Sequence, residues 1–163
     1  MDLRAIVLRF LKFGVVGASG VVVNLGVYVA LTRLLGLGES LLTQVIAYGM
    51  SVEISIFTNY LLNDLWTFRD RRAGASWPKR LWLFHLVSLV GFAINWGIFA
   101  GLNLLLAHTG GTMVGHLVVL GRDVGNVDDL LAACIGIGAA MFWNFFGNLL
   151  WTWTAEKDLE DAG

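Results

Sequence analysis

Several asparagines and one glutamate stand inside otherwise apolar stretches of the sequence, where polar side chains are costly. Four of the amides lie near the middle of such a stretch: Asn24, Asn59, Asn95 and Asn144. Glu53 lies in the second stretch. A carboxamide both donates and accepts hydrogen bonds, as a hydroxyl group does. A ring of four amides at one depth therefore suits the passage of an uncharged, hydroxylated cargo.

Two further asparagines, Asn63 and Asn148, belong to a pattern that closes two of these stretches. The sequence reads NYLLNDLWTF over residues 59–68 and NFFGNLLWTW over residues 144–153. These two amides would lie near one mouth of the passage. An indole at a membrane boundary places its ring among acyl chains and its N–H among headgroups. We therefore interpret six aromatic residues as depth anchors at one interface: Trp66, Phe68, Trp77, Trp82, Trp151 and Trp153.

The composition indicates the medium in which these residues lie. Of the 163 residues, 57% are hydrophobic and 14% are charged, and the mean hydropathy is +0.72. A soluble domain is about half apolar and about a quarter charged. Four stretches are long enough to cross a bilayer: 10–32, 41–65, 81–106 and 129–152. The first is longer than a signal-peptide core, so we expect it to remain as a helix. We predict an all-α integral membrane protein with four transmembrane helices.

The basic residues predict the orientation of these helices. One side carries most of them: Arg4, Arg9, Lys12, Arg69, Arg71, Arg72, Lys79, Arg80 and Lys157. The other side carries Arg33 and Arg122. Cytoplasmic segments are enriched in Lys and Arg. Both termini and the middle loop are therefore expected in the cytoplasm, in a multi-pass protein of the plasma membrane.

The sequence also contains an internal repeat. One constant shift along the chain pairs Asn59 with Asn144 and also pairs Asn63 with Asn148. A second, shorter shift relates the first and third stretches, pairing Asn24 with Asn95 and Arg9 with Arg80. We interpret the chain as two parallel repeats of one helical hairpin, related by an axis along the membrane normal. Because neither hairpin could bury its polar stripe alone, we expect a single domain over residues 1–163.

Small residues spaced by four precede the amides in the second and fourth stretches: Ala47, Ser51 and Ser55, then Ala132, Gly136 and Ala140. Small residues let helix backbones approach closely, and amides then form hydrogen bonds across the contact. The amides thus have two interpretations, helix packing and a hydrophilic passage, and both stay open at this stage. Cys134, the single cysteine, is expected to be a buried inert thiol.

Glu53 and His85 are the ionisable groups that need a separate explanation. Glu53 lies close to the predicted midplane, and no basic residue is expected at that depth. We expect it to be neutral and hydrogen-bonded to an amide or hydroxyl across a helix contact, so that Glu53→Gln is nearly silent. A proton-coupled exporter would need the ionised form instead. His85 is expected to be interfacial or hydrogen-bonded. We find no nucleophile–base pair and no metal-ligand spacing, and we predict neither an enzyme nor a cofactor, metal or nucleic-acid site.

The segments RFLKFGVVGASGVVVNLGVYVAL, NYLLNDLWTF and NFFGNLLWTW resemble the GtrA-like family of small four-helix membrane proteins. The most specific pieces are the F-x-x-x-G opening at Phe13 and the N-x-x-W-T-F closing at Asn63. That closing often carries a basic residue after the asparagine, where this chain has Asp64 and Leu149. The resemblance implies a role in cell-surface polysaccharide synthesis, moving a polyprenyl-phosphate-linked sugar from the cytoplasmic to the outer leaflet. Some members resemble membrane anchors of a polyprenyl-phosphate glycosyltransferase instead.

The residues fit a lipid-linked sugar translocator as the first hypothesis. A basic rim would attract the phosphate: Arg9, Lys12, Arg69, Arg71, Arg72, Lys79 and Arg80. A juxtamembrane basic residue contributes about 1 kcal/mol at an anionic surface. The asparagines would pass the sugar while the prenyl tail stays in lipid. The alternatives are a non-transporting subunit that recruits a glycosyltransferase and, third, a proton-coupled exporter. Because four helices make a thin wall, we expect a homo-oligomer or a partner subunit.

Overall fold

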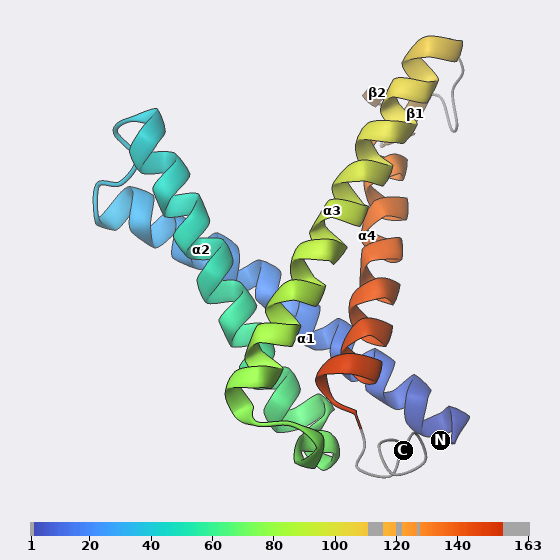
Figure 1. Ribbon diagram of the computed structural model, residues 1–163. Helices are drawn as coiled ribbons and strands as arrows, with labels where there is room; N and C mark the ends of the chain where they lie inside the picture. The colour runs from blue at the N-terminus through green and yellow to red at the C-terminus, as the bar shows by residue number, and fades with distance from the viewer. Residues whose placement is uncertain (1, 111–115, 120–121, 127, 155–163) are drawn as a thin grey trace. The chain divides into compact units, whose positions relative to one another are not determined.

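A computed structural model describes residues 2–110, 116–119, 122–126 and 128–154 (Figure 1). Within them, four helical segments are long and apolar enough to cross a membrane: Leu3–Leu34, Leu41–Thr67, Trp77–Thr109 and Asp128–Thr152. Each contains one of the predicted spans, so the four-helix membrane architecture is confirmed. Lys157, which entered the prediction of orientation, lies outside the described residues.

The elements follow one another along the chain as α1 (Leu3–Val29), η1 (Ala30–Leu34), α2 (Leu41–Leu62), η2 (Asn63–Thr67), η3 (Arg69–Gly74), α3 (Trp77–Thr109), β1 (His116–Val119), β2 (Arg122–Asn126), α4 (Asp128–Gly147) and η4 (Asn148–Thr152). Large apolar side chains are exposed on all four long helices, among them Val22, Ile46, Phe92 and Phe142. Such a surface suits contact with lipid rather than with water.

Local sequence signals explain where the first two helices begin and end. The Asp2 side chain accepts a hydrogen bond from the Arg4 N–H at 3.2 Å and caps α1. Ser40 and Thr43 form a reciprocal capping box at the start of α2, with each side chain accepting the other residue's backbone N–H. Between these helices Gly36 has φ +74°, a conformation that a residue with a side chain rarely adopts.

The long helices α1, α2 and α4 each end in a π-helical turn, in which an N–H group bonds five residues back. In η2 the Phe68 N–H donates to the Asn63 carbonyl at 2.8 Å, and in η4 the Trp153 N–H donates to the Asn148 carbonyl at 2.9 Å. The same kind of turn forms η1. The repeated N-x-x-W-T-aromatic sequence thus forms the same wide turn twice, which we did not predict.

The connection between α3 and α4 contains a small element that was not predicted, and the all-α class of the protein is unchanged. Its described part contains two short antiparallel strands, β1 and β2. Their pairing joins His116 to Asn126 and Val119 to Arg122, with an irregularity between Leu117 and Val118.

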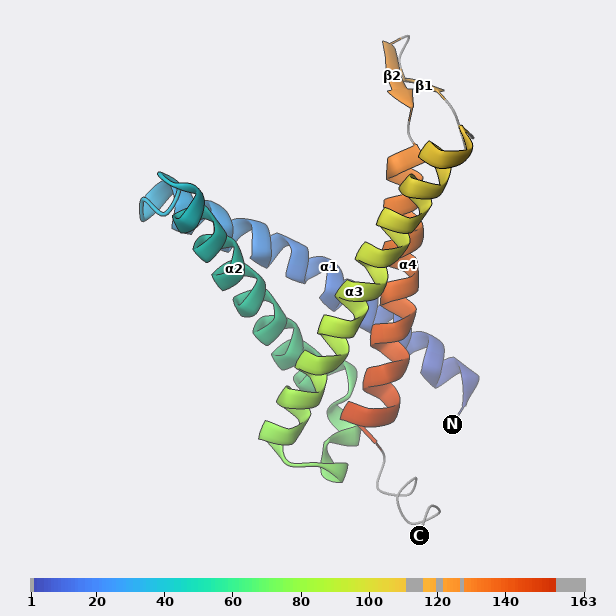
Figure 2. The ribbon, with the colours of Figure 1, turned by 45° about the horizontal axis from the view of Figure 1, so that its top comes forward.

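The chain divides into two compact units, which are considered separately. The first contains residues 1–85 and 148–163, and the second contains residues 86–147. The single-domain organisation, the hairpin repeat and the cytoplasmic location of both termini stay predictions. Figures 1 and 2 both show α3 and α4 side by side.

The predicted stripes of small residues are buried, as expected for helix contacts. In the first unit Ser55 Oγ donates a hydrogen bond to the Gly20 carbonyl at 2.8 Å, which joins α2 to α1. In the second unit Trp143 Nε1 donates to the Val87 carbonyl at 3.1 Å, which joins α4 to α3. Cys134 was expected to be buried, but it lies exposed on α4. A thiol behaves as a small hydrophobic group and is therefore tolerated on an apolar surface.

Candidate functional site

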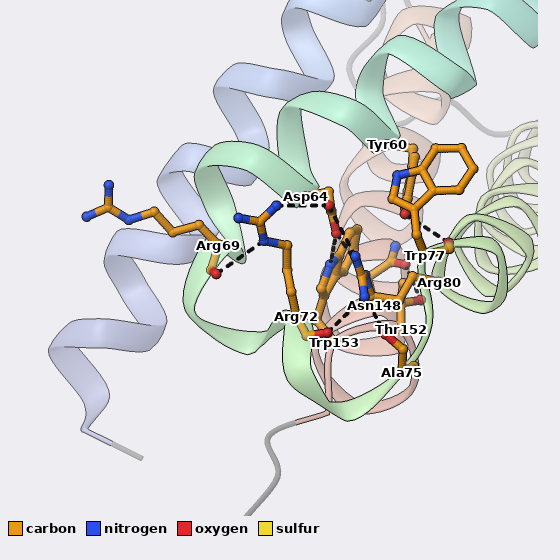
Figure 3. A network of polar contacts seen from close by, with 10 residues as sticks. All are labelled: Tyr60, Asp64, Arg69, Arg72, Ala75, Trp77, Arg80, Asn148, Thr152 and Trp153. Carbon is orange, nitrogen blue, oxygen red and sulfur yellow. Dashed lines mark hydrogen bonds and ion pairs between the residues drawn. The ribbon is translucent and has the colours of Figure 1, made fainter.

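A buried carboxylate, Asp64, lies at the centre of a polar cluster in the first unit. Its Oδ1 accepts hydrogen bonds from Arg80 Nε at 2.8 Å and from Trp153 Nε1 at 2.9 Å. Its Oδ2 accepts a longer one from Arg80 Nη2 at 3.3 Å and lies 3.6 Å from Arg72 Nη1 (Figure 3). Asp64 is only 2% exposed. A buried carboxylate is tolerable here because charged and polar donors surround it. We call these four residues and the aromatic rings packed on them the Asp64 cluster.

The π-turns explain how the ends of η2 and η4 place their buried residues in the Asp64 cluster. In each turn the asparagine, the threonine and the following aromatic residue are buried, as Asn63, Thr67 and Phe68 show in η2. The tryptophan between them, Trp66 or Trp151, is exposed in both turns. The extra residue in the turn rotates the final aromatic ring inward, away from the direction that an ordinary α-helix would give it.

An aromatic stack completes the Asp64 cluster. The rings of Phe68 and Trp153 lie 4.4 Å apart with an interplanar angle of 8°, and the Tyr60 ring stacks on Trp153 with centroids 6.0 Å apart. The Tyr60 hydroxyl donates to the Trp77 carbonyl at 3.1 Å, and Arg71 Nε donates to the Trp153 carbonyl at 2.6 Å. The side chains of Tyr60, Phe68 and Trp153 are fully buried.

This arrangement corrects the interpretation of the aromatic residues as depth anchors. Four of the six are exposed, as an anchor requires: Trp66, Trp77, Trp82 and Trp151. Phe68 and Trp153 are instead core residues of the Asp64 cluster. Sequence position alone did not separate the two groups, because the rotation introduced by the π-turn was not expected.

The predicted basic rim is only partly available for a phosphate. Arg71 and Arg80 are buried, and Arg80 is held by Asp64 and by the carbonyls of Arg72 and Ala75. Arg9 forms an ion pair with Asp70. Internal carboxylates and backbone carbonyls therefore occupy guanidinium donors that were expected to bind an external anion.

Other members of the rim remain accessible. The Lys12 ammonium lies 5.5 Å from the centroid of the Trp66 ring, a cation–π distance. Arg69 and Lys79 are exposed, and neither side chain has an ion pair among the described residues. Figure 3 shows the Arg69 side chain pointing away from the Asp64 cluster.

Three of the four mid-membrane amides lie in helix contacts. A Cβ placed on Gly20 would lie 2.2 Å from Asn59 Nδ2, so the amide fills the space above this glycine. In the second unit, Asn144 lies against Gly91 in the same way. These two contacts correspond to each other under the two shifts that define the predicted repeat.

The remaining predicted amides have different surroundings. Asn95 lies against Gly136, where a Cβ would meet its Oδ1 at 2.5 Å and its backbone carbonyl at 2.7 Å. Asn24 is half-buried. Asn63 Nδ2 donates to the Asn59 carbonyl at 3.0 Å, and Asn148 Oδ1 accepts from the Thr152 hydroxyl at 2.7 Å. Helix packing therefore explains the best-placed amides, and the ring of four amides at one depth stays a prediction.

The expected environment of Glu53 was wrong. Its side chain is 63% exposed rather than inserted into a helix contact, and its Oε1 lies 3.7 Å from His85 Nε2. Glu53 and His85 line a groove of about 350 Å³ together with Phe57, Pro78 and Trp82. The expectation failed because counting residues along two helices ignores both helix inclination and the reach of the side chains.

The role of Asp64 as the centre of a buried cluster was not predicted, and its position was known only as a departure from a family pattern. A usable signal was present. A carboxylate at the apolar end of a membrane span needs a charged partner where it is buried. Arg80, which lies 16 positions away, supplies it.

The four spans, their exposed apolar surface and the satisfied polar cluster at one end define a multi-pass membrane protein. The GtrA/DPMS transmembrane domain model matches residues 12–153, so this chain belongs to that family. The chain is also similar to a dolichol-phosphate mannosyltransferase of Pyrococcus furiosus, with 36% identity over 123 residues. This match covers 71% of the chain but 33% of the relative, so the chain spans about a third of that protein's length.

Proposed function

We propose that this protein moves a polyprenyl-phosphate-linked sugar from the cytoplasmic to the outer leaflet of the membrane. Its family and its similarity to a dolichol-phosphate mannosyltransferase both support a place in a polyprenyl-phosphate sugar pathway. The translocation step itself is the inference. A lipid-linked sugar combines a phosphate, a hydroxylated ring and a long apolar tail, and a protein that moves it has to accommodate all three.

The observation that carries the proposal is the position of Lys79 beside the groove that Glu53, His85 and Trp82 line. Lys79 is exposed in the first turn of α3, next to Pro78, which lines the groove, and one helical turn from Trp82. A phosphate held by Lys79 at the membrane surface would leave the sugar that it carries beside the groove, while the prenyl tail stays in lipid. The amino-terminal end of α3 adds a favourable dipole for an anion. Arg69 is another accessible base of the predicted rim in the first unit.

Vesicles that contain the purified protein test this proposal. Labelled dolichyl-phosphate mannose is placed in one leaflet, and its appearance in the other leaflet is followed by quenching or enzymatic oxidation. We expect faster exchange than in protein-free vesicles. Because each juxtamembrane base contributes about 1 kcal/mol, the double variant Arg69→Gln, Lys79→Gln should lower the affinity for the lipid roughly thirtyfold. Arg4→Gln, which removes an exposed base near the start of α1, is the matched control.

A second function is favoured by the comparison with the mannosyltransferase. Because the matched region is one third of a longer transferase, this chain could serve as the membrane subunit of a separate polyprenyl-phosphate glycosyltransferase. In that case the vesicles would show no exchange above background. A glycosyltransferase from the same organism would still bind the chain and work faster on lipid-linked substrate in its presence. Binding without exchange would therefore replace the first proposal with the second.

The proposed assembly follows from the same considerations. Four helices enclose little space, and three of the predicted passage amides lie within helix contacts. We therefore propose that a second copy or a partner subunit completes the lipid path. Crosslinking in native membranes tests this, and a solitary chain under conditions where exchange is observed would contradict it.

A further inference from the structure

The groove between α2 and the first turns of α3 combines two groups that a purely lipid-facing surface would not carry. Glu53 is an exposed carboxylate within a membrane-spanning helix, where such a group is costly and is a marker of function. His85 faces it from α3. The predicted repeat does not account for the carboxylate, because the shift that pairs Asn59 with Asn144 places Gly138 at the corresponding position.

The distance between the two groups leaves both able to bind a ligand. His85 Nε2 and Glu53 Oε1 are 3.7 Å apart, which is longer than a hydrogen bond. Neither side chain forms another polar contact within the described residues. A carboxylate accepts hydrogen bonds through two oxygens, and an imidazole both donates and accepts. A hydroxylated ring that enters the groove can therefore hydrogen-bond to both.

The aromatic residues of the groove provide the second half of such a site. Trp82 is 63% exposed and Phe57 is 44% exposed, and both line the same groove as Glu53 and His85. A sugar ring has one face of C–H groups and an edge of hydroxyl groups. The C–H face packs on an indole ring, and the hydroxyl edge needs acceptors and donors. The groove offers both kinds of contact within about 350 Å³.

We propose that this groove binds the monosaccharide headgroup of the lipid-linked substrate, with Trp82 against the ring face and Glu53 and His85 on its hydroxyl groups. This inference rests on the proposed function and names the part of the structure that recognises the sugar. The phosphate is bound elsewhere, at the accessible bases, so sugar and phosphate recognition are separable. The mid-membrane amides are not required for this first binding step.

The test compares two probes on the whole chain in phosphatidylcholine nanodiscs: dolichyl-phosphate mannose and dolichyl phosphate. Glu53→Ala and Trp82→Leu should each weaken binding of the mannose probe about tenfold. Binding of dolichyl phosphate should stay within twofold. Glu53→Gln keeps one acceptor oxygen and should lose less than Glu53→Ala. Both side chains are exposed, so both variants should fold, which gel filtration checks.

The chain offers matched controls for both substitutions. Glu39 is an exposed carboxylate just before the start of α2, and Trp151 is an exposed indole outside the groove. Glu39→Ala and Trp151→Leu should leave both probes within twofold. Equal losses for both probes, or no loss for either, would overturn the sugar assignment. Displacement of the mannose probe by phosphatidylglycerol as readily as by unlabelled dolichyl-phosphate mannose would overturn it as well.

The outcomes also separate this inference from the proposed function. If the wild-type chain binds both probes equally and neither groove variant changes this, the chain binds the lipid phosphate but the groove is not the sugar site. If the wild-type chain binds neither probe above empty nanodiscs, the proposed function fails and the sugar site fails with it.

Discussion

The rings of Phe68 and Trp153 stack 4.4 Å apart and nearly parallel, although one residue follows η2 and the other follows η4. Each ring ends one copy of the repeated N-x-x-W-T-aromatic sequence. This stacking contact therefore packs the end of η4 against the end of η2 within the Asp64 cluster. The Trp153 indole N–H extends the same contact to the carboxylate of Asp64 at 2.9 Å.

Replacing Trp153 should destabilise the fold strongly. Trp153→Ala removes a fully buried ring, and such truncations cost about 3–5 kcal/mol. Trp153→Phe keeps a ring for the stack but removes the N–H donor, and should cost about 1–3 kcal/mol. The free energy of unfolding in mixed micelles, measured by detergent titration, checks both values. Trp151→Ala, at an exposed position in the same turn, should change it by less than about 0.5 kcal/mol.

The buried pair of Asp64 and Arg80 should respond asymmetrically to single and double substitution. Asp64→Leu introduces the residue that the second repeat carries at Leu149, but it leaves Arg80 buried without its carboxylate. Breaking one side of a buried pair costs about 3–5 kcal/mol. Adding Arg80→Met should restore most of the loss, because an apolar pair of similar volume is often neutral. A double-mutant cycle on the unfolding free energy measures this recovery.

The ion pair of Arg9 and Asp70 is the control for that cycle. Asp70 is 55% exposed, and an exposed pair contributes about 0–1 kcal/mol. Asp70→Asn should therefore change stability little. If Asp70→Asn costs as much as Asp64→Leu, or if Arg80→Met fails to compensate, the central position of Asp64 in the cluster is wrong.

Adding a methyl group to Gly20 should disturb the contact between α1 and α2. The new Cβ would lie 2.2 Å from the Asn59 amide, so the amide has to move. Overpacking of this kind costs about 1–3 kcal/mol. Adding Asn59→Ala should relieve the clash and recover stability. Gly26→Ala is the matched control, because nothing lies within 4 Å of its Cβ position and the helix propensity of alanine is higher.

Gly136 should behave differently from Gly20. Its Cβ would meet the backbone carbonyl of Asn95 at 2.7 Å as well as the Asn95 side chain. Truncating the side chain does not move a carbonyl, so Asn95→Ala should fail to rescue Gly136→Ala. Thermal unfolding of the single and double variants tests this. Full rescue would show that the two helix backbones are farther apart than described.

Cysteine labelling checks the predicted orientation. After Cys134→Ala removes the exposed native thiol, Gly74→Cys in η3 should react with a membrane-impermeant reagent only from the cytoplasmic side. Glu39→Cys, between η1 and α2, should react only from outside. The opposite pattern would place Lys79 and Arg69 outside and remove the basis of the phosphate assignment.

Features that depend on hydrophobicity and side-chain size could be predicted from the sequence. The four spans follow from hydrophobic length, and the buried positions of Ser51, Ser55 and Gly136 follow from spacing and small size. Hydrophobic length and the spacing of small residues are properties of one segment at a time, so both can be determined from the order of residues along the chain.

The direction in which a side chain points, and the residue that it contacts, could not be predicted by counting along the chain. The inward rotation of Phe68 and Trp153 requires a π-turn, which the composition of the segment does not reveal. The capture of Arg80 by Asp64 and the approach of His85 to Glu53 depend on how side chains reach across a contact. Residue numbers give the position of a residue along its own helix, but they do not show which residue of a neighbouring helix its side chain contacts.

The fit of amides over glycines also limits how this protein can move. Asn59 occupies the space above Gly20, and Ser55 holds the carbonyl of the same glycine, so α1 cannot slide along α2 without losing both contacts. In the second unit, Asn144 blocks sliding at Gly91 in the same manner. Large motions of packed helices proceed by rocking of whole elements when sliding is blocked. If the proposed translocation takes place, it would therefore proceed by rigid-body steps in which packed helices move together.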